Sequence, residues 1–247
     1  MTQAQKRYYN IYSRDGYFLY KNLLSKKIIN KIIKEIKLAK NTDKYYDSKN
    51  NLRRVEKLYN KGKNLILLNK KILNLMKNIF NENFIIFKDK FNAKPPGGDG
   101  FYPHFDGIFK FIDAKNKKKN GWYEYSNFFI NILVALDECN KKNGTIELAK
   151  KHTGNFKDLL KKTKNDGTPA IKSSILKNIK FNSINLKVGD AIFFSNTCPH
   201  KSKKNLSNKN RRILYYTYTK FKNRPLYKMY YQDKKNSKNK LKALEDK

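Results

Sequence analysis

The chain has 247 residues, of which 56 are Lys or Arg and 20 are Asp or Glu, so its formal net charge is +36. A chain of this length can bury a full core without splitting, and we expect one domain over residues 1–247. No apolar run approaches the roughly eighteen residues needed to cross a bilayer and the opening segment lacks a secretory signal, so we expect a cytoplasmic protein without membrane attachment.

The composition also limits the partners and the covalent structure of the protein. Seven of the 56 basic residues are arginine and the rest are lysine, an excess that A/T-rich codons explain. Proteins that read nucleic acids favour arginine, because its planar guanidinium binds bases and phosphates. We therefore expect no specific nucleic-acid partner, only non-specific polyanion binding at low salt. The chain has two cysteines, Cys139 and Cys198, too few to stabilise a domain of this size by disulfide bonds. We expect both to be reduced and structural.

Residues 1–83 are predicted to form an N-terminal strand and helices after a polar start. "GYFLYKNLLS" indicates a short strand and turn, and "SKKIINKIIKEIKLAK" has isoleucines at helical spacing with Ser25 placed to cap the helix. The polar stretch from about Asn41 to Asn64 is expected to be loop and irregular structure. A second amphipathic helix is predicted over "LILLNKKILNLMKNIF".

From Phe84 the pattern changes to β-branched and aromatic runs separated by Gly, Asn and Pro. Such an order predicts a mainly β fold with flanking helices: a double-stranded β-helix (jelly roll, cupin-like) core over residues 84–220, with the N-terminal helices packed on one sheet. Residues 157–180 are expected to be an insertion between strands. Residues 221–247 are expected to form a basic C-terminal tail, frayed from Leu226. The predicted strands lie in 84–91, 126–136, 144–149, 181–188, 190–196 and 211–221.

The segment "GFYPHFDGIF" holds a histidine and an aspartate in His-x-Asp spacing. On a strand, His104 and Asp106 point to the same face, and His200, just after a later apolar strand, can join them across a jelly roll. Two histidines and one carboxylate form the facial site of non-haem Fe(II) oxygenases. A core histidine bonded to an aspartate is the alternative for the pair alone, while a zinc hydrolase would usually show His-Glu-x-x-His, which is absent.

Polar residues after His200 suggest a place for a dicarboxylic cosubstrate. Ser202 follows two residues later, and Arg211 opens the last strong strand. An arginine can bind bidentately the carboxylate that does not touch the metal, and its charge would be costly to bury for packing alone. Arg212, the next residue, should point to the opposite face.

The motifs together resemble the phytanoyl-CoA dioxygenase family of Fe(II)/2-oxoglutarate oxygenases over nearly the whole chain. The resemblance lies in "DGYFLYKNLLSKKIINKI", "NILVALDECNKKNGTIELAKKHTG" and, most specifically, "LKVGDAIFFSNTCPHKSKKNLSNKNRR". It implies that iron is bound by His104, Asp106 and His200, with Arg211 and Ser202 on the distal carboxylate of 2-oxoglutarate. Lys94 in "FNAKPP" resembles a lysine that contacts this cosubstrate in related hydroxylases, a solvated lysine being the alternative.

The same resemblance implies a reaction that consumes O2 and 2-oxoglutarate, releases succinate and CO2, and oxidises a small-molecule substrate. Related halogenases replace the carboxylate of the iron site with a small residue, so Asp106 favours hydroxylation or desaturation. His152 stands where the family has Pro-Gly-Ser-His but lacks that turn, and we interpret it as structural or as a residue that supports the metal ligands, not as a ligand itself. The mixed aromatic and polar surroundings favour a small polar or anionic metabolite.

The central strand and its neighbours supply the remaining candidates. Alternation along 127–136 predicts one fully apolar face for the helices and places Asn131 towards the cavity, where it could bond 2-oxoglutarate or substrate, or be satisfied by backbone. Tyr102, Phe109 and Trp122 are candidate walls of the substrate pocket, although Trp122 could simply pack.

Two rival functions stay open at this point. One is nucleic-acid demethylation by the AlkB-like branch of these oxygenases, which carries an Arg-x5-Arg pair that the adjacent Arg211 and Arg212 do not match. The other is a non-enzymatic basic jelly-roll module that binds anionic polymers. Such a module would bind no stoichiometric Fe(II) and would not turn over 2-oxoglutarate.

Overall fold

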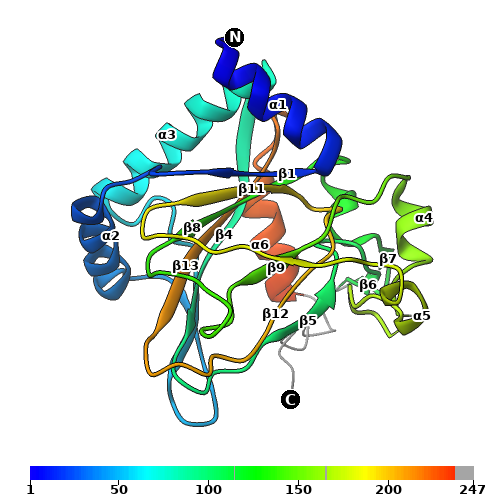
Figure 1. Cartoon of the computed structure of the whole chain (residues 1–247). Coiled ribbons are helices and arrows are strands. Elements are labelled where there is room, and N and C mark those ends of the chain that lie inside the picture. The colour runs from blue at the N-terminus through cyan, green and yellow to red at the C-terminus, as the bar shows by residue number, and fades with distance from the viewer. Residues whose placement is uncertain (114, 165, 237–247) are drawn as a thin grey trace.

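Two antiparallel sheets and a set of helices make up the computed structural model, which describes residues 1–113, 115–164 and 166–236 (Figure 1). The larger sheet has seven strands in the order β1-β11-β8-β13-β4-β3-β2, and the smaller has four in the order β10-β9-β12-β5. The larger sheet comprises β1 (Tyr17–Tyr20), β2 (Asp43–Tyr46), β3 (Leu52–Glu56), β4 (Phe84–Lys94), β8 (Ile130–Ala135), β11 (Ala191–Ser195) and β13 (Arg211–Lys220). The smaller comprises β5 (Phe101–His104), β9 (Ile146–Leu148), β10 (Asn182–Ser183) and β12 (His200–Ser202), and β6 (Phe111–Ile112) pairs separately with β7 (Lys118–Lys119).

Three helices cover the outer face of the larger sheet: α1 (Gln3–Asp15), α2 (Lys26–Leu38) and α3 (Lys63–Phe80) (Figure 1). Two of them confirm the sequence prediction, and Ser25 caps α2 by accepting a hydrogen bond from the Ile28 N–H at 3.5 Å. Helix α1 was not predicted, although Thr2 and Gln5 form a capping box at its start. Only Tyr12 of this helix is buried, so its sequence is mostly polar and lacks the apolar stripe that would predict a helix.

The predicted alternation along the central strand β8 is confirmed. Ile130, Ile132 and Val134 pack in one core with the isoleucines of α2 and α3, while Leu133 and Ala135 pack in another core between the sheets. Since successive side chains of a strand point to opposite faces, the helices take the apolar face and the interior takes the mixed one. Asn131 therefore points into the space between the two sheets.

The stretch from 41 to 64 is not the predicted loop. Strands β2 and β3 form a hairpin there, and β3 extends the larger sheet by pairing with β4. The hairpin turn is closed by Asp47, whose Oδ1 accepts hydrogen bonds from the Lys49 and Asn51 N–H groups. The sequence of this hairpin is polar because the hairpin ends the sheet, with β2 at the edge, and because Arg54 points towards the interior. The polar sequence therefore did not predict strands.

The prediction of a frayed tail from Leu226 is wrong as far as residue 236. Helix α6 (Leu226–Asn236) packs against β4, burying Leu226, Tyr230 and Tyr231 with Phe87. Tyrosines at helical spacing form the packed face, Lys228 and Lys235 are exposed, and Lys234 pairs with the buried Glu56. Residues 237–247, the rest of the predicted tail, lie outside the described part of the chain.

The segment predicted as an insertion does connect two strands of the smaller sheet. It contains α4 (Phe156–Leu160) and α5 (Ser173–Leu176), and its apolar side chains pack against Phe105 and Ile108 beside the His-x-Asp segment. A short 3-10 helix at Gly121–Glu124 packs on the same region. Cys139 and Cys198 are buried and free, as predicted.

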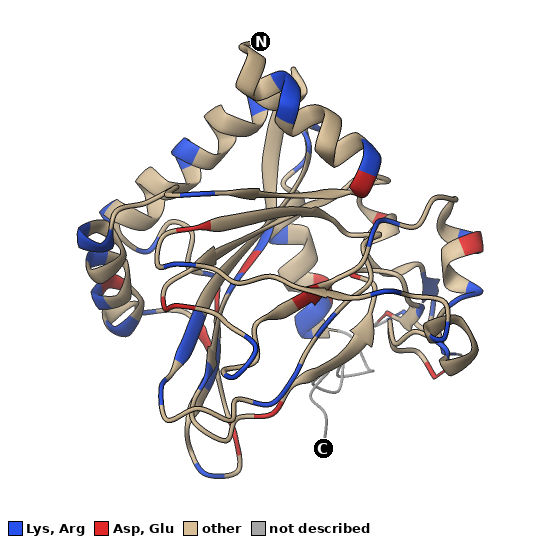
Figure 2. Ribbon diagram, in the orientation of Figure 1, with Lys and Arg blue, Asp and Glu red and all other residues tan. Residues whose placement is uncertain are grey.

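Figure 2 shows Lys and Arg distributed over the helices and over strands of both sheets. Across the described residues, no helix is both long and apolar enough to span a bilayer. With positive charge on every side of the molecule, the electrostatics of an interior site depend on which cations turn inward.

Candidate metal centre and adjoining pocket

Two short paired strands bring His104, Asp106 and His200 together. His104 ends β5 and pairs directly with His200, the first residue of β12, and Asp106 follows two residues after His104. One potential ligand atom from each residue lies within 4.8 Å of the others, and His200 Nε2 is 3.6 Å from Asp106 Oδ2. The structure thus assembles the three residues that the sequence singled out.

Backbone carbonyl groups fix the tautomer of both imidazoles. His104 Nδ1 lies 2.8 Å from the Tyr102 carbonyl oxygen, and His200 Nδ1 lies 3.0 Å from the Cys198 carbonyl oxygen. A carbonyl oxygen only accepts hydrogen bonds, so each Nδ1 carries the proton and each Nε2 of the neutral ring keeps its lone pair. This outer hydrogen bond is the usual support of a metal-binding histidine.

The charge states of the three residues also suit a divalent cation. Burial lowers the pKa of His104 to about 3 and, in the same direction, the pKa of His200, so both rings stay neutral. Burial opposes ionisation of Asp106, but the neighbouring His200 and His104 and the ammonium groups of Lys90 and Lys88 outweigh it and keep its pKa below the ordinary value. The cluster therefore offers two lone pairs and a carboxylate.

Asn131 supports this carboxylate directly. Its Nδ2 donates to Asp106 Oδ2 at 2.9 Å, and its Oδ1 accepts from the Thr217 hydroxyl at 2.7 Å. Both ends of the buried amide are thus occupied by protein groups. The structure places Asn131 on Asp106, a candidate metal ligand, whereas the sequence suggested 2-oxoglutarate, substrate or backbone as its partner.

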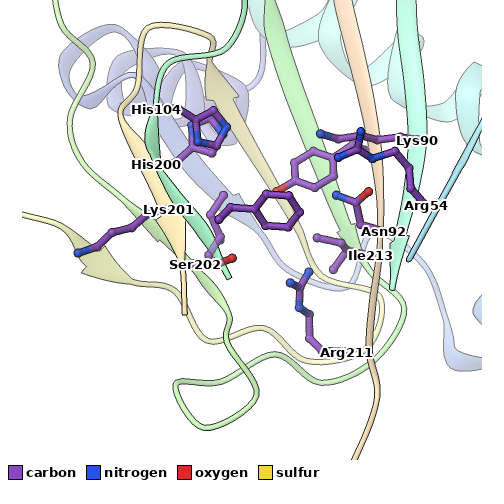
Figure 3. Close-up of a pocket in the computed structure, with 12 residues that line it drawn as sticks. Arg54, Lys90, Asn92, His104, His200, Lys201, Ser202, Arg211 and Ile213 are labelled. Atoms are coloured by element: carbon purple, nitrogen blue, oxygen red, sulfur yellow. The ribbon is translucent and has the colours of Figure 1, made fainter. Parts of the chain in front are cut away.

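A pocket lies beside the histidines, between the two sheets. Figure 3 shows the imidazoles of His104 and His200 on one side, Arg211 at a second edge, and Lys90 with Arg54 across from the imidazoles. Its lining residues are Arg54, Lys90, Asn92, Phe101, His104, Ile146, His200, Lys201, Ser202, Arg211, Ile213 and Tyr215.

Arg211 and Arg212 separate as predicted for neighbours on a strand. Arg211 lines the pocket, is only 3% exposed, and its Nε has no hydrogen-bond partner among the described residues. Arg212 instead forms a bidentate pair with Asp137, at 2.7 and 2.8 Å. A buried guanidinium with an unsatisfied donor is costly unless a ligand completes it, so Arg211 suits an anionic ligand.

Ser202 also lines the pocket, and Lys94 lies behind it. The Lys94 ammonium donates to Ser202 Oγ at 2.8 Å and to the Gly144 carbonyl at 3.3 Å, with a further hydrogen bond to the Lys203 carbonyl. Its side chain is 1% exposed, so the solvated-lysine alternative is wrong. In this structure Lys94 orients Ser202 rather than lining the pocket itself.

The three aromatic candidates and His152 lie outside the lining of this pocket. Trp122 packs against Phe87 and Phe129, and Phe109 belongs to the same buried cluster. Tyr102 contributes its carbonyl group to His104. His152 packs against Phe105 and lies near Lys162, away from the triad.

Sequence reasoning missed the cations of the opposite wall. Lys90 and Asn92 lie on β4, and Arg54 lies on β3 directly opposite Asn92. The available signal was the alternation Lys88, Lys90, Asn92, Lys94 along one face of a strand. Burial and the nearby charges of Lys88 and Arg54 lower the pKa of Lys90 to about 7.

Comparison with known proteins identifies related sequences. The family model described as phytanoyl-CoA dioxygenase (PhyH) matches residues 12–213. A 2-aminoethylphosphonate dioxygenase from an uncultured bacterium is 26% identical over 178 residues, covering 72% of this chain and 62% of that protein. A methylphosphonate hydroxylase from Gimesia maris is 30% identical over 159 residues, covering 64% of this chain and 54% of that protein. The chain therefore spans between half and two thirds of the length of these relatives.

Solved structures of similar fold cover most of the chain. EctD from S. alaskensis with bound Fe superposes with a TM-score of 0.67 at 16% sequence identity, covering 89% of this chain and 76% of that one. SnoN, an α-ketoglutarate-dependent epimerase from nogalamycin biosynthesis, gives a TM-score of 0.64 at 15% identity, covering 87% of this chain and 83% of that one. These likenesses confirm the predicted jelly-roll fold.

Proposed function

The chain belongs to the phytanoyl-CoA dioxygenase family, and from that membership we propose that it is an Fe(II)- and 2-oxoglutarate-dependent dioxygenase. It would hydroxylate a small-molecule metabolite and release succinate and CO2. The observation that carries the proposal is one pocket lined by both metal-binding imidazoles and by the buried Arg211. Such a pocket can hold a metal and, a short distance away, the free end of a dicarboxylic acid.

The residues present fit an Fe(II) ion. Two neutral imidazoles with fixed Nδ1 protons and one carboxylate match the two-histidine, one-carboxylate donor set of non-haem oxygenases. His104, Asp106 and His200 would hold the ion. When bound, iron would supply the activation of dioxygen and the oxidative decarboxylation of 2-oxoglutarate.

The chain's own residues would position the reactants around that ion. Asn131 holds the Asp106 carboxylate in place, and Arg211 would pair with the distal carboxylate of 2-oxoglutarate. Ser202, held by Lys94, would add a hydroxyl group to the same end. Both imidazoles and Arg211 are buried, which limits the access of water and strengthens these charge interactions.

Relatives suggest where to look for the substrate. The two curated relatives carry names that specify 2-aminoethylphosphonate and methylphosphonate, so phosphonates are the first compounds to screen. The test is to load the purified protein anaerobically with Fe(II), admit O2 and 2-oxoglutarate, and measure succinate with and without each compound. We expect one iron per chain and succinate release that a true substrate stimulates.

Two outcomes would contradict the proposal. Protein that binds no stoichiometric Fe(II) and releases no succinate would be a non-enzymatic basic module. Succinate release stimulated by methylated single-stranded DNA, and by none of the small molecules, would instead identify a nucleic-acid demethylase. His152→Gln, which changes the histidine outside the triad, provides the control that iron is not held by histidine in general.

A further inference from the structure

The opposite wall of the pocket carries more positive charge than 2-oxoglutarate could use. We propose that Lys90 and Arg54, with Asn92, form a second anion subsite that binds a dianionic phosphonate or phosphate group of the primary substrate. This inference rests on the proposed function, since it assigns Arg211 to the cosubstrate and the second subsite to the molecule that is oxidised.

Strand register places the three side chains next to one another. Asn92 of β4 pairs with Arg54 of β3, and Lys90 lies two residues away on the same strand and therefore on the same face. The ring of Tyr215, across from Lys90 on β13, lies 4.8 Å from the Lys90 ammonium. All four line the pocket that also contains His104 and His200.

Distance along β4 separates this subsite from the Arg211 end. Arg211 pairs with Lys94, four residues beyond Lys90, which corresponds to about 13 Å along an extended strand. Figure 3 likewise shows Arg211 at a different edge of the pocket from Lys90 and Arg54. This spacing favours two anionic groups, one at each end of the pocket, over a single compact group that contacts both Lys90 and Arg211.

The balance of charge favours an anion at this wall. The charges of a bound Fe(II) ion would be offset by Asp106 and by the nearer carboxylate of 2-oxoglutarate, and Arg211 would be offset by the distal carboxylate. Within the described part of the chain, no carboxylate forms an ion pair with Lys90. The carboxylate next to Arg54 is Glu56, at 4.0 Å, and Glu56 is already paired more closely with Lys234.

An unsatisfied polar atom marks the same wall. Asn92 is 5% exposed, and its Oδ1 has no hydrogen-bond partner among the described residues. Buried polar atoms in folded proteins are nearly always satisfied, so an acceptor left open in a pocket indicates a ligand group. Because Oδ1 accepts hydrogen bonds, it suits an amino or hydroxyl group next to the anion.

Two cations side by side favour a doubly charged group. Lys90 and Arg54 would together balance a phosphonate or phosphate dianion, and arginine adds a planar pair of donors that fits two of its oxygens. A carboxylate would leave one of these cations without a partner. The matching small probes are methylphosphonate, methyl phosphate and acetate, which differ in charge and in the atom that carries the oxygens.

The experiment measures the affinity of each probe by titration calorimetry, using the iron-loaded protein saturated with 2-oxoglutarate under anaerobic conditions. The variants are Lys90→Met and Arg54→Met, which keep most of the apolar stem and remove the charge. The control is Lys201→Met, since Lys201 also lines the pocket but lies 3.6 Å from the Glu147 carboxylate. A second titration, with 2-oxoglutarate alone, follows the cosubstrate end in the same variants.

We expect methylphosphonate or methyl phosphate to bind at least about tenfold more tightly than acetate. Whichever of these two probes binds more tightly indicates whether the natural substrate carries a phosphonate or a phosphate group. Lys90→Met and Arg54→Met should each weaken this binding about tenfold or more, as expected for the loss of a charged hydrogen bond. Lys201→Met should change it less than about twofold. The affinity for 2-oxoglutarate should change less than about threefold in all three variants, and Lys90→Arg should restore binding of the probe.

Three results would overturn the proposal. Equal binding of acetate would show that there is no dianion subsite, and an equal loss in Lys201→Met would show that only diffuse charge acts. A loss of 2-oxoglutarate binding in Lys90→Met would assign Lys90 to the cosubstrate. If the unaltered protein failed to bind 2-oxoglutarate at all, the proposed function would fail instead, and that result is seen before any variant is tested.

Discussion

The smaller sheet brings the two imidazoles of the candidate metal site to the pocket, whereas the larger sheet brings the cations Arg54, Lys90 and Arg211. His104 and His200 lie on two short strands that pair residue to residue, which holds their rings with centroids 4.1 Å apart. Arg54, Lys90 and Arg211 instead come from three adjacent strands, β3, β4 and β13, and line different parts of the pocket. Close pairing suits the narrow geometry that a metal needs, while wide spacing suits ligands of different lengths.

The strongest test of this division removes a donor from the smaller sheet. We expect His104→Ala or Asp106→Ala to abolish succinate formation, by about a thousandfold or more, because two ligands do not hold the ion in the right geometry. Iron content should fall with activity, while circular dichroism and the thermal midpoint should show an intact fold. If either variant retained full activity, the metal assignment would be wrong.

Changing the arginine of the larger sheet should alter binding of 2-oxoglutarate without removing the metal. We expect Arg211→Met to raise the KM for 2-oxoglutarate about a hundredfold, since a bidentate charged contact is lost in a buried site. Iron content should stay near one per chain. The neighbouring Arg212→Met, which breaks only the pair with Asp137, is the matched control and should shift KM less than about threefold. Equal effects of the two variants would remove Arg211 from the cosubstrate site.

Asn131 connects the two sheets, because it lies on β8 and donates to Asp106. We expect Asn131→Ala to weaken Fe(II) binding about tenfold, the lower end of the effect of removing a residue that orients a metal ligand. Competition with a coloured chelator would measure it. Asn127→Ala, at an exposed position just before the same strand, should leave iron affinity unchanged. A loss of stability without a loss of iron affinity would make Asn131 a packing residue only.

The smallest expected effect is a pH dependence that belongs to the larger sheet alone. Burial and nearby cations lower the pKa of Lys90 to about 7, so its charged form is complete only below that pH. We expect sulfate, whose own charge is constant near neutrality, to bind most tightly at about pH 6 and to lose up to about tenfold per pH unit above pH 7. The same titration of Lys90→Met should be flat. The charged and titratable groups around Lys90 are Lys88 on β4, Arg54 and Glu56 on β3, Tyr215 on β13, and Asp106 beyond β5.

If the affinity of Lys90→Met for sulfate also fell above pH 7, another of these groups would be the one that titrates. Iron loading in the unaltered protein should not follow the same pH curve, since both histidines remain neutral throughout this range. That contrast would separate the behaviour of the two sheets in one experiment.

Sequence alone predicted most of the side chains that the smaller sheet contributes to the candidate site, and few of those that the larger sheet contributes. His104, Asp106 and His200 could be found because histidine is scarce, with three in the chain, and because the His-x-Asp pair is followed by a third histidine in the resembled family's motif. Arg211 could be found because it follows His200 at the family's interval. Arg54 and Lys90 could not, because lysine is abundant everywhere and the strand that carries Arg54 was taken for a loop. Only pairing with β4 reveals which cations face inward.

The helices show the same limit on a larger scale. Helices α2 and α3 were predicted from isoleucine and leucine at helical spacing, the pattern of a helix with one buried face. Helices α1 and α6 bury tyrosines instead, and their other side chains are mostly charged or polar. Their formation depends on a surface already built by the sheet, which local sequence does not contain.

Helix α6 carries a consequence for the transfer of specificity between relatives. Its Lys234 occupies the Glu56 carboxylate, and that pairing leaves Arg54 and Lys90 with their charge available to the pocket. Grafting the two cations with strands β3 and β4 into a scaffold without this helix would also graft Glu56, an acidic neighbour able to neutralise them. If Arg54 and Lys90 bind the substrate, transfer of that specificity requires β3, β4 and a helix whose Lys234 lies 178 residues after Glu56.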